Sequence, residues 1–378
     1  MYYLMNKDEV IAKFSVDQMM DTIAIEEQYE QLPEWYGDLR NFIRNRRAPK
    51  HRENIKELLK LSGCDTMKGY LDISRALSLV DTFWVKQTDS NLTWNDVSLY
   101  THPFNEVIAK TAFEGGLHGH NFSTTSPEYG TDGSFAKCWI REGNTIKMLK
   151  RGSSGARNAG LEPYSEYYSS CVIRNFTDNY VKYNLRMHGG RICSVCNIFT
   201  SEDYGFVPYA AIDTGNTSIE TLLTKVQSLG FENEVKTMLV IDAIIMNADR
   251  HKNNFGFIIN NDTLQIEGFA PLFDHNLALM PYAEEESEFE LDGEYYNNHG
   301  PRIGDDWIPI AAGCLTPKLR KVLINLKSFE FERHPKYNLP EWRLKALERE
   351  MHAIIDAILD KDAMYTKSIT VQQMPKFD

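Results

Sequence analysis

Three polar residues in the second half of the chain have the types and the spacing that phosphoryl transfer requires. Asp249 lies five residues before Asn254 in the segment NADRHKNNFGF, and Asp274 follows in FAPLFDHNLAL. With this spacing, one short loop can place a carboxylate base beside a hydroxyl group while its far end binds a Mg²⁺ ion. Asp274 would be the second metal ligand, because Mg²⁺ needs few protein ligands besides water and substrate phosphates.

Two short apolar runs, 255–259 and 264–269, predict how Asn254 and Asp274 meet. The Asn-Asn-Asp segment between the runs tolerates the left-handed backbone of a tight turn, so the runs predict an antiparallel hairpin. Because the open ends of a hairpin lie side by side, this fold brings the two residues into one region. A polar hairpin with a helix-capping aspartate is the alternative interpretation of the loop alone.

The segment before the loop, Val235–Met246, predicts a rigid support for Asp249. This segment is almost continuously apolar and has the length of a helix, which indicates a buried helix. Asp242 within it is interpreted as a polar anchor for the loop, and the alternative is a helix residue that faces water.

The order of residues in these motifs resembles the HipA-like serine/threonine kinases and, more distantly, the phosphatidylinositol kinases. Typical protein kinases place His-Arg before the aspartate, whereas Arg250 and His251 follow it here. The resemblance extends over about residues 123–279, and more weakly into the helices beyond them. It implies an α+β fold of the bilobal protein-kinase type, with a β-rich N-lobe, a helical C-lobe and an additional N-terminal region.

The resemblance divides the chain into three regions. Residues 1–116 would form a mixed α/β accessory region, residues 117–205 the N-lobe with a glycine-rich loop, and residues 206–378 the C-lobe with the catalytic loop. In the first region, the basic run Arg44–Arg52 is interpreted as a solvated connection between helices. Sequence patterns there predict one hairpin and three helices, over 2–16, 33–46, 52–62 and 73–79.

A loop that covers the phosphates of ATP is expected upstream, and Ser123–Lys137 lies in that place. Its glycines, Gly130 and Gly133, let backbone amides approach phosphates closely, although the stretch is not a Walker loop and resembles many ordinary surface loops. In the HipA-like family this loop can carry an autophosphorylation site. Gly130 occupies the usual serine position, which leaves Thr131 and Ser134 as the candidates. The resemblance assigns nucleotide contacts to Asp132, Gly133, Ser134 and Lys137.

A second hairpin is predicted for the runs 135–141 and 144–151, which alternate apolar and polar residues across a Glu-Gly turn. The alternation places Lys147 and Lys150 on opposite faces, so only one of them can point inward. We expect Lys150 to do so, because its position matches the lysine of the HipA strand. The resemblance implies that Lys150 offsets phosphate charge and that Glu166 holds it by an ion pair. The alternative is that both lysines are solvated.

The hydrophobic run Arg191–Thr200 predicts a strand where kinases place the hinge that contacts adenine. The resemblance implies that Asn197 and Phe199 bind the nucleotide through backbone hydrogen bonds and an apolar edge. Cys193 and Cys196 also form a CxxC pattern, but a structural zinc site needs a second ligand pair, which the sequence does not offer.

The C-terminal region is predicted to be helical over 317–329 and 340–360. The acidic stretch Glu284–Glu294 before these helices is interpreted as a solvated loop, and the alternatives are a site for a basic peptide or an activation segment. The second helix carries one apolar stripe, which consists of Leu344, Leu347, Met351, Ile354, Ile355 and Ile358.

Composition and charge narrow the class of protein. The chain has 378 residues, of which 42% are hydrophobic and 25% charged, and this balance excludes a disordered chain. The formal net charge of -12 opposes general binding to nucleic acid, and the 6 cysteines do not form a secreted framework. No apolar run is long enough to cross a bilayer, and the N-terminus lacks the order of a signal peptide. We therefore expect a cytoplasmic protein without direct nucleic-acid or membrane contacts.

These features predict one mechanism. Asp249 orients a Ser or Thr hydroxyl, Asn254 and Asp274 hold Mg²⁺ against the phosphates of ATP, Lys150 offsets their charge, and His251 contacts phosphate or braces the loop. The resemblance implies a HipA-like protein kinase that can phosphorylate itself and that can belong to a toxin–antitoxin system with an antitoxin partner. The alternatives are a small-molecule or lipid kinase and a non-catalytic ATP-binding partner module.

Overall fold

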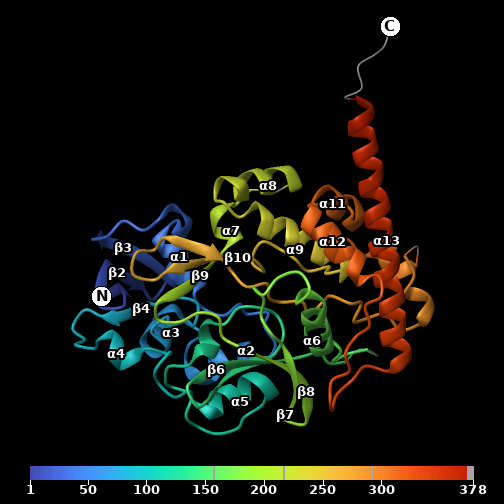
Figure 1. The fold of residues 1–378 in the computed structure, drawn as a ribbon. Coiled ribbons are helices and arrows are strands. Elements are labelled where there is room, and N and C mark those ends of the chain that lie inside the picture. The colour runs from blue at the N-terminus through green and yellow to red at the C-terminus, as the bar shows by residue number, and fades with distance from the viewer. Residues whose placement is uncertain (156–157, 216–217, 292, 373–378) are drawn as a thin grey trace. The chain divides into compact units, whose positions relative to one another are not determined.

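The chain forms two compact units, each assembled from separate stretches of sequence (Figure 1). The computed structural model describes residues 1–155, 158–215, 218–291 and 293–372. Unit 1 consists of residues 1–153, 186–214 and 256–270, and unit 2 of residues 154–185, 215–255 and 271–378. The boundary predicted near residue 116 falls inside unit 1, so the division into three regions stays a prediction.

The N-terminal part of unit 1 contains a four-stranded antiparallel sheet with the order β3-β2-β1-β4. The hairpin predicted over residues 2–16 is confirmed, because it forms β1 and β2. Sequence patterns did not predict the two edge strands. The bounds are Tyr2–Asn6 for β1, Glu9–Asp17 for β2, Thr22–Gln28 for β3 and Phe83–Gln87 for β4.

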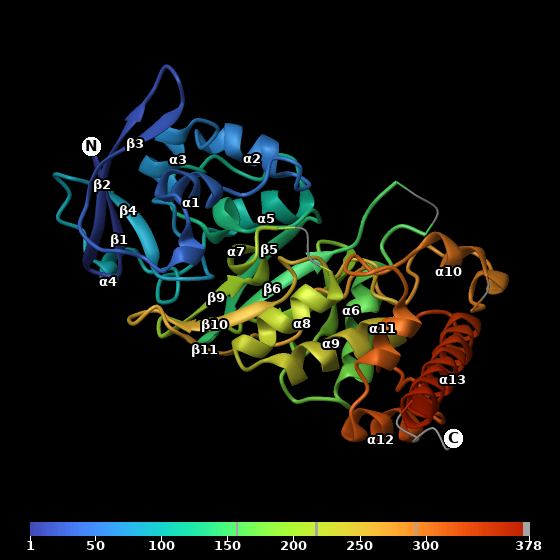
Figure 2. The ribbon, with the colours of Figure 1, turned by 90° about the horizontal axis from the view of Figure 1, so that it is seen from above.

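Short helices pack on this sheet around one hydrophobic core (Figure 2). The first predicted helix begins later than expected, because Asp38 caps it by accepting hydrogen bonds from backbone N–H groups. The third predicted helix lies upstream of its predicted position, since Arg75 and Ala76 have positive φ and end it. The helices around this core are η1 Glu34–Tyr36, α1 Leu39–Asn45, α2 Ile55–Ser62, α3 Met67–Ser74 and α5 Glu106–Glu114. Helix α4 Trp94–Val97 belongs to a second core cluster, and α7 Tyr209–Ile212 contacts β9 and β10.

The interpretation of the basic run Arg44–Arg52 as a solvated connection is wrong. Arg46 is buried and forms two hydrogen bonds of 2.7 Å with the carboxylate of Asp81. Arg52 is also buried, and it donates to the carbonyl oxygens of Glu128 and Thr131. Burial lowers the pKa of Arg52 to about 10, which still leaves it charged at neutral pH. The run therefore fixes the backbone of the glycine-rich stretch.

Two further sheets complete unit 1. One has the order β5-β6-β8-β7, and the other has the order β11-β10-β9. Both predicted hairpins are confirmed as antiparallel pairs, β5 with β6 and β10 with β11. The 3-10 helix η2 Pro127–Gly130 precedes β5. The strands are β5 Lys137–Glu142, β6 Thr145–Arg151, β7 Asn184–His188, β8 Arg191–Asn197, β9 Tyr204–Pro208, β10 Gly256–Asn260 and β11 Ile266–Phe269.

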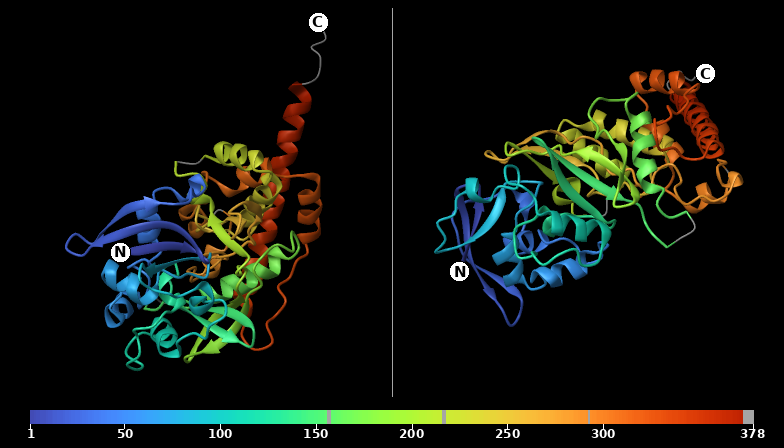
Figure 3. Two further views of the ribbon diagram at one scale, coloured as in Figure 1. Left: turned by 90° about the vertical axis from the view of Figure 1, so that its left-hand side faces the viewer. Right: turned by 90° about the horizontal axis from the view of Figure 1, so that it is seen from below.

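Unit 2 is mainly helical. Helix α11 packs against both α9 and α13, and the predicted apolar stripe of α13 is completely buried. The second half of α13 runs past α11 and α12 (Figure 3). Among the described residues, no helix is both long and apolar enough to cross a membrane. The elements are α6 Glu162–Ile173, α8 Ile219–Ser228, α9 Glu232–Ile244, η3 Glu286–Glu288, α10 Glu294–Asn298, α11 Trp307–Gly313, α12 Pro317–Leu326 and α13 Glu341–Gln372.

Candidate active site

A buried ion pair supports the loop that follows α9. The carboxylate of Asp242 accepts hydrogen bonds from Arg250 Nε at 2.8 Å and from Arg250 Nη2 at 3.0 Å. It also accepts one from Asn247 Nδ2 at 3.0 Å. The side chains of Arg250 and Asp242 are only 3% and 5% exposed, so this pair is held inside unit 2. The interpretation of Asp242 as an anchor for the loop is therefore confirmed.

Arg250 also joins the loop to the segment that carries Asp274. Its Nη1 atom donates to the carbonyl oxygens of Asn254 at 2.6 Å and Phe273 at 2.8 Å. Its Nη2 atom lies 3.0 Å from Nδ1 of the buried His275. One guanidinium thus fixes the backbone next to two of the predicted metal ligands, and this requires the planar fork of an arginine.

The three predicted catalytic residues are brought together in unit 2. Asn254 donates its amide Nδ2 to the carbonyl oxygen of Asp249 at 2.9 Å, which leaves its Oδ1 atom to accept a cation. Asp274 has a φ of 57°, an uncommon value for a non-glycine residue, and its N–H donates to the hydroxyl of Tyr183 at 3.1 Å. Such a backbone conformation persists where the surrounding contacts determine it.

The electrostatics of Asp249 indicate that its carboxylate lies near that of Asp274. Burial raises the pKa of Asp249, and the negative charge of Asp274 raises it further. The positive charges of His251 and Arg302 act in the opposite direction and lower this pKa. Two neighbouring carboxylates and one amide oxygen are the hard oxygen donors that Mg²⁺ prefers, so the residues present fit this cation.

His251 braces the loop, which is one of the two roles predicted for it. Its Nδ1 atom accepts a hydrogen bond from the backbone N–H of Asn253 at 3.3 Å, and its backbone N–H donates to the carbonyl oxygen of Asp249 at 2.8 Å. These bonds hold the loop between Asp249 and Asn253, and the ring is one of the groups that lower the pKa of Asp249.

In unit 1, two lysines meet across the hairpin of β5 and β6. Lys137 and Lys150 are directly paired in register, so their side chains leave the same face of the sheet, and both are buried. Lys147 is less buried and forms an ion pair of 2.6 Å with Glu142. Lys150 is thus the more buried of the two lysines, as expected from the resemblance, and Lys147 lies on the opposite face, as the alternation predicted.

The glycine-rich stretch adjoins these lysines. Lys137 Nζ donates to the carbonyl oxygen of Asp132 at 2.7 Å, and Asp132 Oδ1 accepts the N–H of Gly133 at 2.7 Å. Gly133 has a φ of 97°, and a Cβ atom there would lie 2.2 Å from Lys137 Nζ. The carbonyl oxygen of Ser134 accepts a hydrogen bond from the N–H of Glu53 at 2.9 Å. The positive φ favours glycine at this position, and the absence of a side chain leaves room for the flexible end of Lys137 beside the backbone.

Gly130 has a different role from the one predicted. A Cβ atom at this position would lie 2.9 Å from the carbonyl oxygen of Leu77 and 3.2 Å from that of Arg46. The glycine is therefore needed for close packing inside unit 1, and the expected approach to a phosphate does not explain it. The 3-10 turn that ends at Gly130 is buried, which removes it from the accessible part of the loop.

The remaining predicted nucleotide contacts lie at the end of β8 and on α6. Asn197 is exposed at the last position of β8, and Phe199 packs edge to face on Phe206 with ring centroids 5.7 Å apart. Glu166 is completely buried on α6 in unit 2. Its ion pair with Lys150 would join the two units and stays a prediction.

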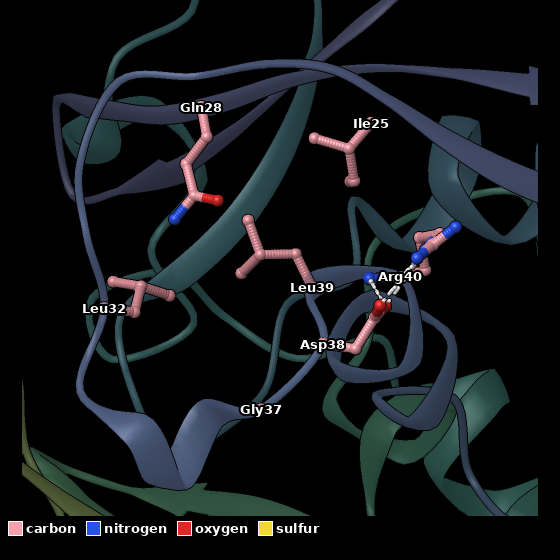
Figure 4. A pocket seen from close by; sticks show the side chains of 7 residues that line it. All are labelled: Ile25, Gln28, Leu32, Gly37, Asp38, Leu39 and Arg40. Carbon is pink, nitrogen blue, oxygen red and sulfur yellow. Dashed lines mark hydrogen bonds and ion pairs between the residues drawn. The ribbon is translucent and has the colours of Figure 1, made fainter.

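A cavity of about 350 Å³ lies in unit 1, apart from all of these residues (Figure 4). Asp38 and Arg40 bond to each other at its rim, and the Asp38 carboxylate already caps α1. Because its charged groups are engaged with each other, this cavity is a poor candidate for the chemical site. The lining residues are Ile25, Gln28, Leu32, Gly37, Asp38, Leu39 and Arg40.

Sequence reasoning missed three residues of the site. Arg250 was noticed only for its order after Asp249, although its charge beside a helix that carries a buried aspartate is a signal for an internal ion pair. Tyr183 and Arg302 come from distant segments. Arg302 Nη2 lies 3.1 Å from Asp249 Oδ1, a contact for which no local pattern exists.

Two solved structures are similar to this chain in fold. The Helicobacter pylori proinflammatory kinase CtkA is 17% identical, with a TM-score of 0.51, and the match covers 66% of this chain and 97% of that chain. A chain of the Shewanella oneidensis MR-1 toxin–antitoxin complex of HipA, HipB and operator DNA is 13% identical. Its TM-score is 0.52, and the match covers 100% of this chain and 92% of that chain.

The chain has the fold of the HipA-like kinases. The prediction of an α+β fold of the protein-kinase type is therefore confirmed. A scan against protein-family models and a search of curated proteins found no match. At these identities the similarity establishes the fold, while the chemistry has to be argued from the residues themselves.

Proposed function

We propose that this chain is an ATP- and Mg²⁺-dependent protein serine/threonine kinase of the HipA type. The observation that carries the proposal is the convergence of Asp249, Asn254 and Asp274 in unit 2, where Arg250 bonds to the backbone on both sides of the group. A base, an amide oxygen and a second carboxylate on one rigid support are the parts that phosphoryl transfer needs.

In this mechanism Asp249 accepts the proton of a Ser or Thr hydroxyl. The hydroxyl oxygen forms a bond to the γ-phosphorus while the bond from that phosphorus to the bridging oxygen of ADP breaks. The raised pKa of Asp249 suits a base, because a carboxylate with a very low pKa takes up a proton poorly. Asn254 and Asp274 would hold Mg²⁺, which neutralises phosphate charge when it is bound.

The proposed contacts with the nucleotide rest on positively charged side chains in unit 1. Lys137 and Lys150 supply two buried positive charges on one face of the β5–β6 hairpin. Such charges stabilise the phosphates in the ground state and the charge that develops during transfer. The backbone of the glycine-rich stretch and the end of β8 complete the proposed set, through Asp132, Gly133, Ser134, Asn197 and Phe199, and Glu166 would orient Lys150.

Self-phosphorylation, if it occurs in the glycine-rich stretch, would use Ser134. The Thr131 hydroxyl donates to the carbonyl oxygen of Pro127 at 2.7 Å and accepts a hydrogen bond from Trp139 Nε1 at 2.8 Å. Ser134 is exposed, so its hydroxyl is the accessible one. A hydroxyl that is held by two internal hydrogen bonds is a poor acceptor.

A protein partner of the antitoxin kind is part of the proposal. It rests on the similarity in fold to a chain from the Shewanella complex of HipA, HipB and operator DNA. Because that complex includes DNA, the expected absence of direct nucleic-acid contacts in this chain stays a prediction. The cytoplasmic location is likewise a prediction.

Intact-mass measurement after incubation with Mg-ATP tests the proposal. We expect a gain of one phosphate in the wild type, no gain without Mg²⁺, and no gain in Ser134→Ala, while Thr131→Ala behaves like the wild type. Transfer to added serine and threonine proteins is measured in the same samples with radiolabelled ATP, and a lipid and a sugar serve as comparison acceptors. A protein that labels neither itself nor any protein acceptor is not a protein kinase.

A further inference from the structure

Arg302 covers the predicted catalytic base. Its Nη2 atom lies 3.1 Å from Asp249 Oδ1, and among the described residues Asp249 is the only one whose side chain pairs with it. The Asp249 side chain is 19% exposed, whereas that of Arg302 is 60% exposed. The guanidinium thus contacts one oxygen of a carboxylate that is itself partly exposed.

The backbone around Arg302 is fixed although its head group is exposed. Ile303 is buried, and residues 301–303 line a cavity of about 10 Å³ whose other wall includes Asp242, Asn247 and Arg250. Gly304 has a φ of 88°, and a Cβ atom there would lie 2.5 Å from Ile310 Cδ1. The segment is thus packed against residues that support the loop, and this packing places Arg302 within reach of Asp249.

An acceptor hydroxyl must compete with Arg302 for Asp249. A general base has to lie about 3 Å from the oxygen whose proton it removes, and here the guanidinium occupies one carboxylate oxygen at a similar distance. A solvent-exposed ion pair of this kind contributes little free energy, so an entering group can open it. The displaced guanidinium then lies beside the entering acceptor, because the packing of Ile303 and Gly304 holds the backbone next to it.

We propose that Arg302 determines acceptor specificity by selecting segments that carry a carboxylate next to the Ser or Thr. That carboxylate takes the guanidinium from Asp249 and leaves the base free to accept the hydroxyl proton. Arginine and carboxylate form a charge-assisted pair that can be bidentate, which a neutral neighbour cannot replace. This inference rests on the proposed kinase function.

The acidic stretch of unit 2 does not remove this preference. Its exposed glutamates include Glu286, which is already paired with Arg349 at 2.6 Å, and exposed charges beyond about 10 Å are largely screened at ordinary salt. Arg302 acts by direct contact at the base itself. Of the acidic stretch, Asp292 lies outside the described residues.

Three peptides, each with a single serine, test the inference. They differ only in the residue next to the serine, which is Asp, Ala or Lys, and kcat/KM is measured with Mg-ATP and the full chain. We expect the wild type to prefer Asp over Lys by about tenfold, the size of one charge-assisted contact in a partly exposed site. Arg302→Glu should reverse the order of Asp and Lys, and Arg302→Lys should keep the order with a smaller ratio.

The matched control is Arg174→Ala. Arg174 Nη2 also lies 3.1 Å from a carboxylate in unit 2, that of Glu332, but this carboxylate is 69% exposed and lies outside the proposed site. The control should keep the wild-type order and ratio. It thus separates the loss of an exposed arginine from the loss of this particular arginine.

The outcomes are decisive in both directions. Equal rates for the three wild-type peptides, a wild-type preference for Lys, or an unchanged order in Arg302→Glu would each overturn the role of Arg302 and leave the kinase function standing. A chain that labels itself but none of the peptides also overturns it, because a neighbouring carboxylate is then insufficient. A chain that transfers no phosphate at all overturns the proposed function first.

Discussion

Two aspartate–arginine pairs lie at the catalytic loop, and they differ in almost every physical respect. Asp242 and Arg250 are buried and share two hydrogen bonds, whereas Asp249 and Arg302 share one contact of 3.1 Å at the surface. Removing one partner of the buried pair leaves an uncompensated charge away from water. Removing Arg302 leaves a carboxylate that water still reaches.

The two pairs therefore have different roles, because one supports the loop and the other contains the proposed base. The buried pair holds the loop and the segment of Asp274 in one arrangement, and it has no route to a substrate. The exposed pair contributes little to stability, so Asp249 can exchange one partner for another during a reaction. A site of this kind needs a rigid base under a reactive group that is only loosely held.

The largest expected effect is on transfer. Asp249→Asn and Asp274→Asn should each lower the rate of phosphoryl transfer by about 10³-fold or more, because each removes a group that acts in the transition state. The melting temperature should stay within a few degrees of the wild type, as measured by circular dichroism. Asp178→Asn, an exposed residue of unit 2, serves as the control. Full activity in either variant would reject the assignment.

The buried pair should dominate stability. We expect Arg250→Ala to lower the free energy of unfolding by about 3–5 kcal/mol, because Asp242 then lacks a counter-charge. Arg302→Ala should change it by about 1 kcal/mol at most. Urea unfolding of both variants gives the comparison directly. Equal losses in the two variants would contradict the contrast between the pairs.

A parallel comparison in unit 1 is between the two lysines of β6, one buried and one ion-paired. Lys150→Ala should lower transfer by about 10²-fold, since a buried positive charge near the phosphates is lost. Lys147→Ala removes a lysine that is paired with Glu142, and it should stay within about twofold of the wild type. Steady-state rates with a fixed protein acceptor measure both. A larger effect for Lys147 would exchange the assigned faces of the strand.

The smallest expected effect is a shift in pH dependence. Activity needs Asp249 deprotonated, so it falls as the pH drops through the pKa of this group, which burial and Asp274 raise. Arg302 lowers the same pKa. Arg302→Ala should therefore move the acidic limb of the kcat/KM profile to higher pH by less than about one unit. A shift to lower pH would mean that another group controls this limb.

Local patterns were sufficient for much of the fold and for part of the site. Alternation predicted the hairpin of β5 and β6, two apolar runs around a turn predicted that of β10 and β11, and spacing predicted the buried stripe of α13. The grouping of the three residues was also predicted from sequence, because Asp249 and Asn254 are close in the chain and the hairpin returns Asp274 towards them. Each of these depends on neighbours within one or two elements.

Sequence patterns did not predict the features that depend on contacts between segments far apart in the chain. The edge strand β3 was not predicted from its sequence, which includes two adjacent glutamates, and it is held by pairing with β2. The run around Arg46 was predicted to be solvated, but the ion pair with Asp81 stabilises Arg46 in a buried position. Arg302 has no local signal, since its contact with Asp249 depends on how the segment before α11 packs beneath the catalytic loop.

The most direct test of the account is a crystal structure with Mn²⁺ and a non-hydrolysable ATP analogue. Manganese takes the place of Mg²⁺ and is located by its anomalous signal. The account predicts a cation bound by the carboxylate of Asp274 and by Oδ1 of Asn254, with Asp249 facing the end of the triphosphate. A cation bound elsewhere, with these three side chains directed away from the nucleotide, would contradict it.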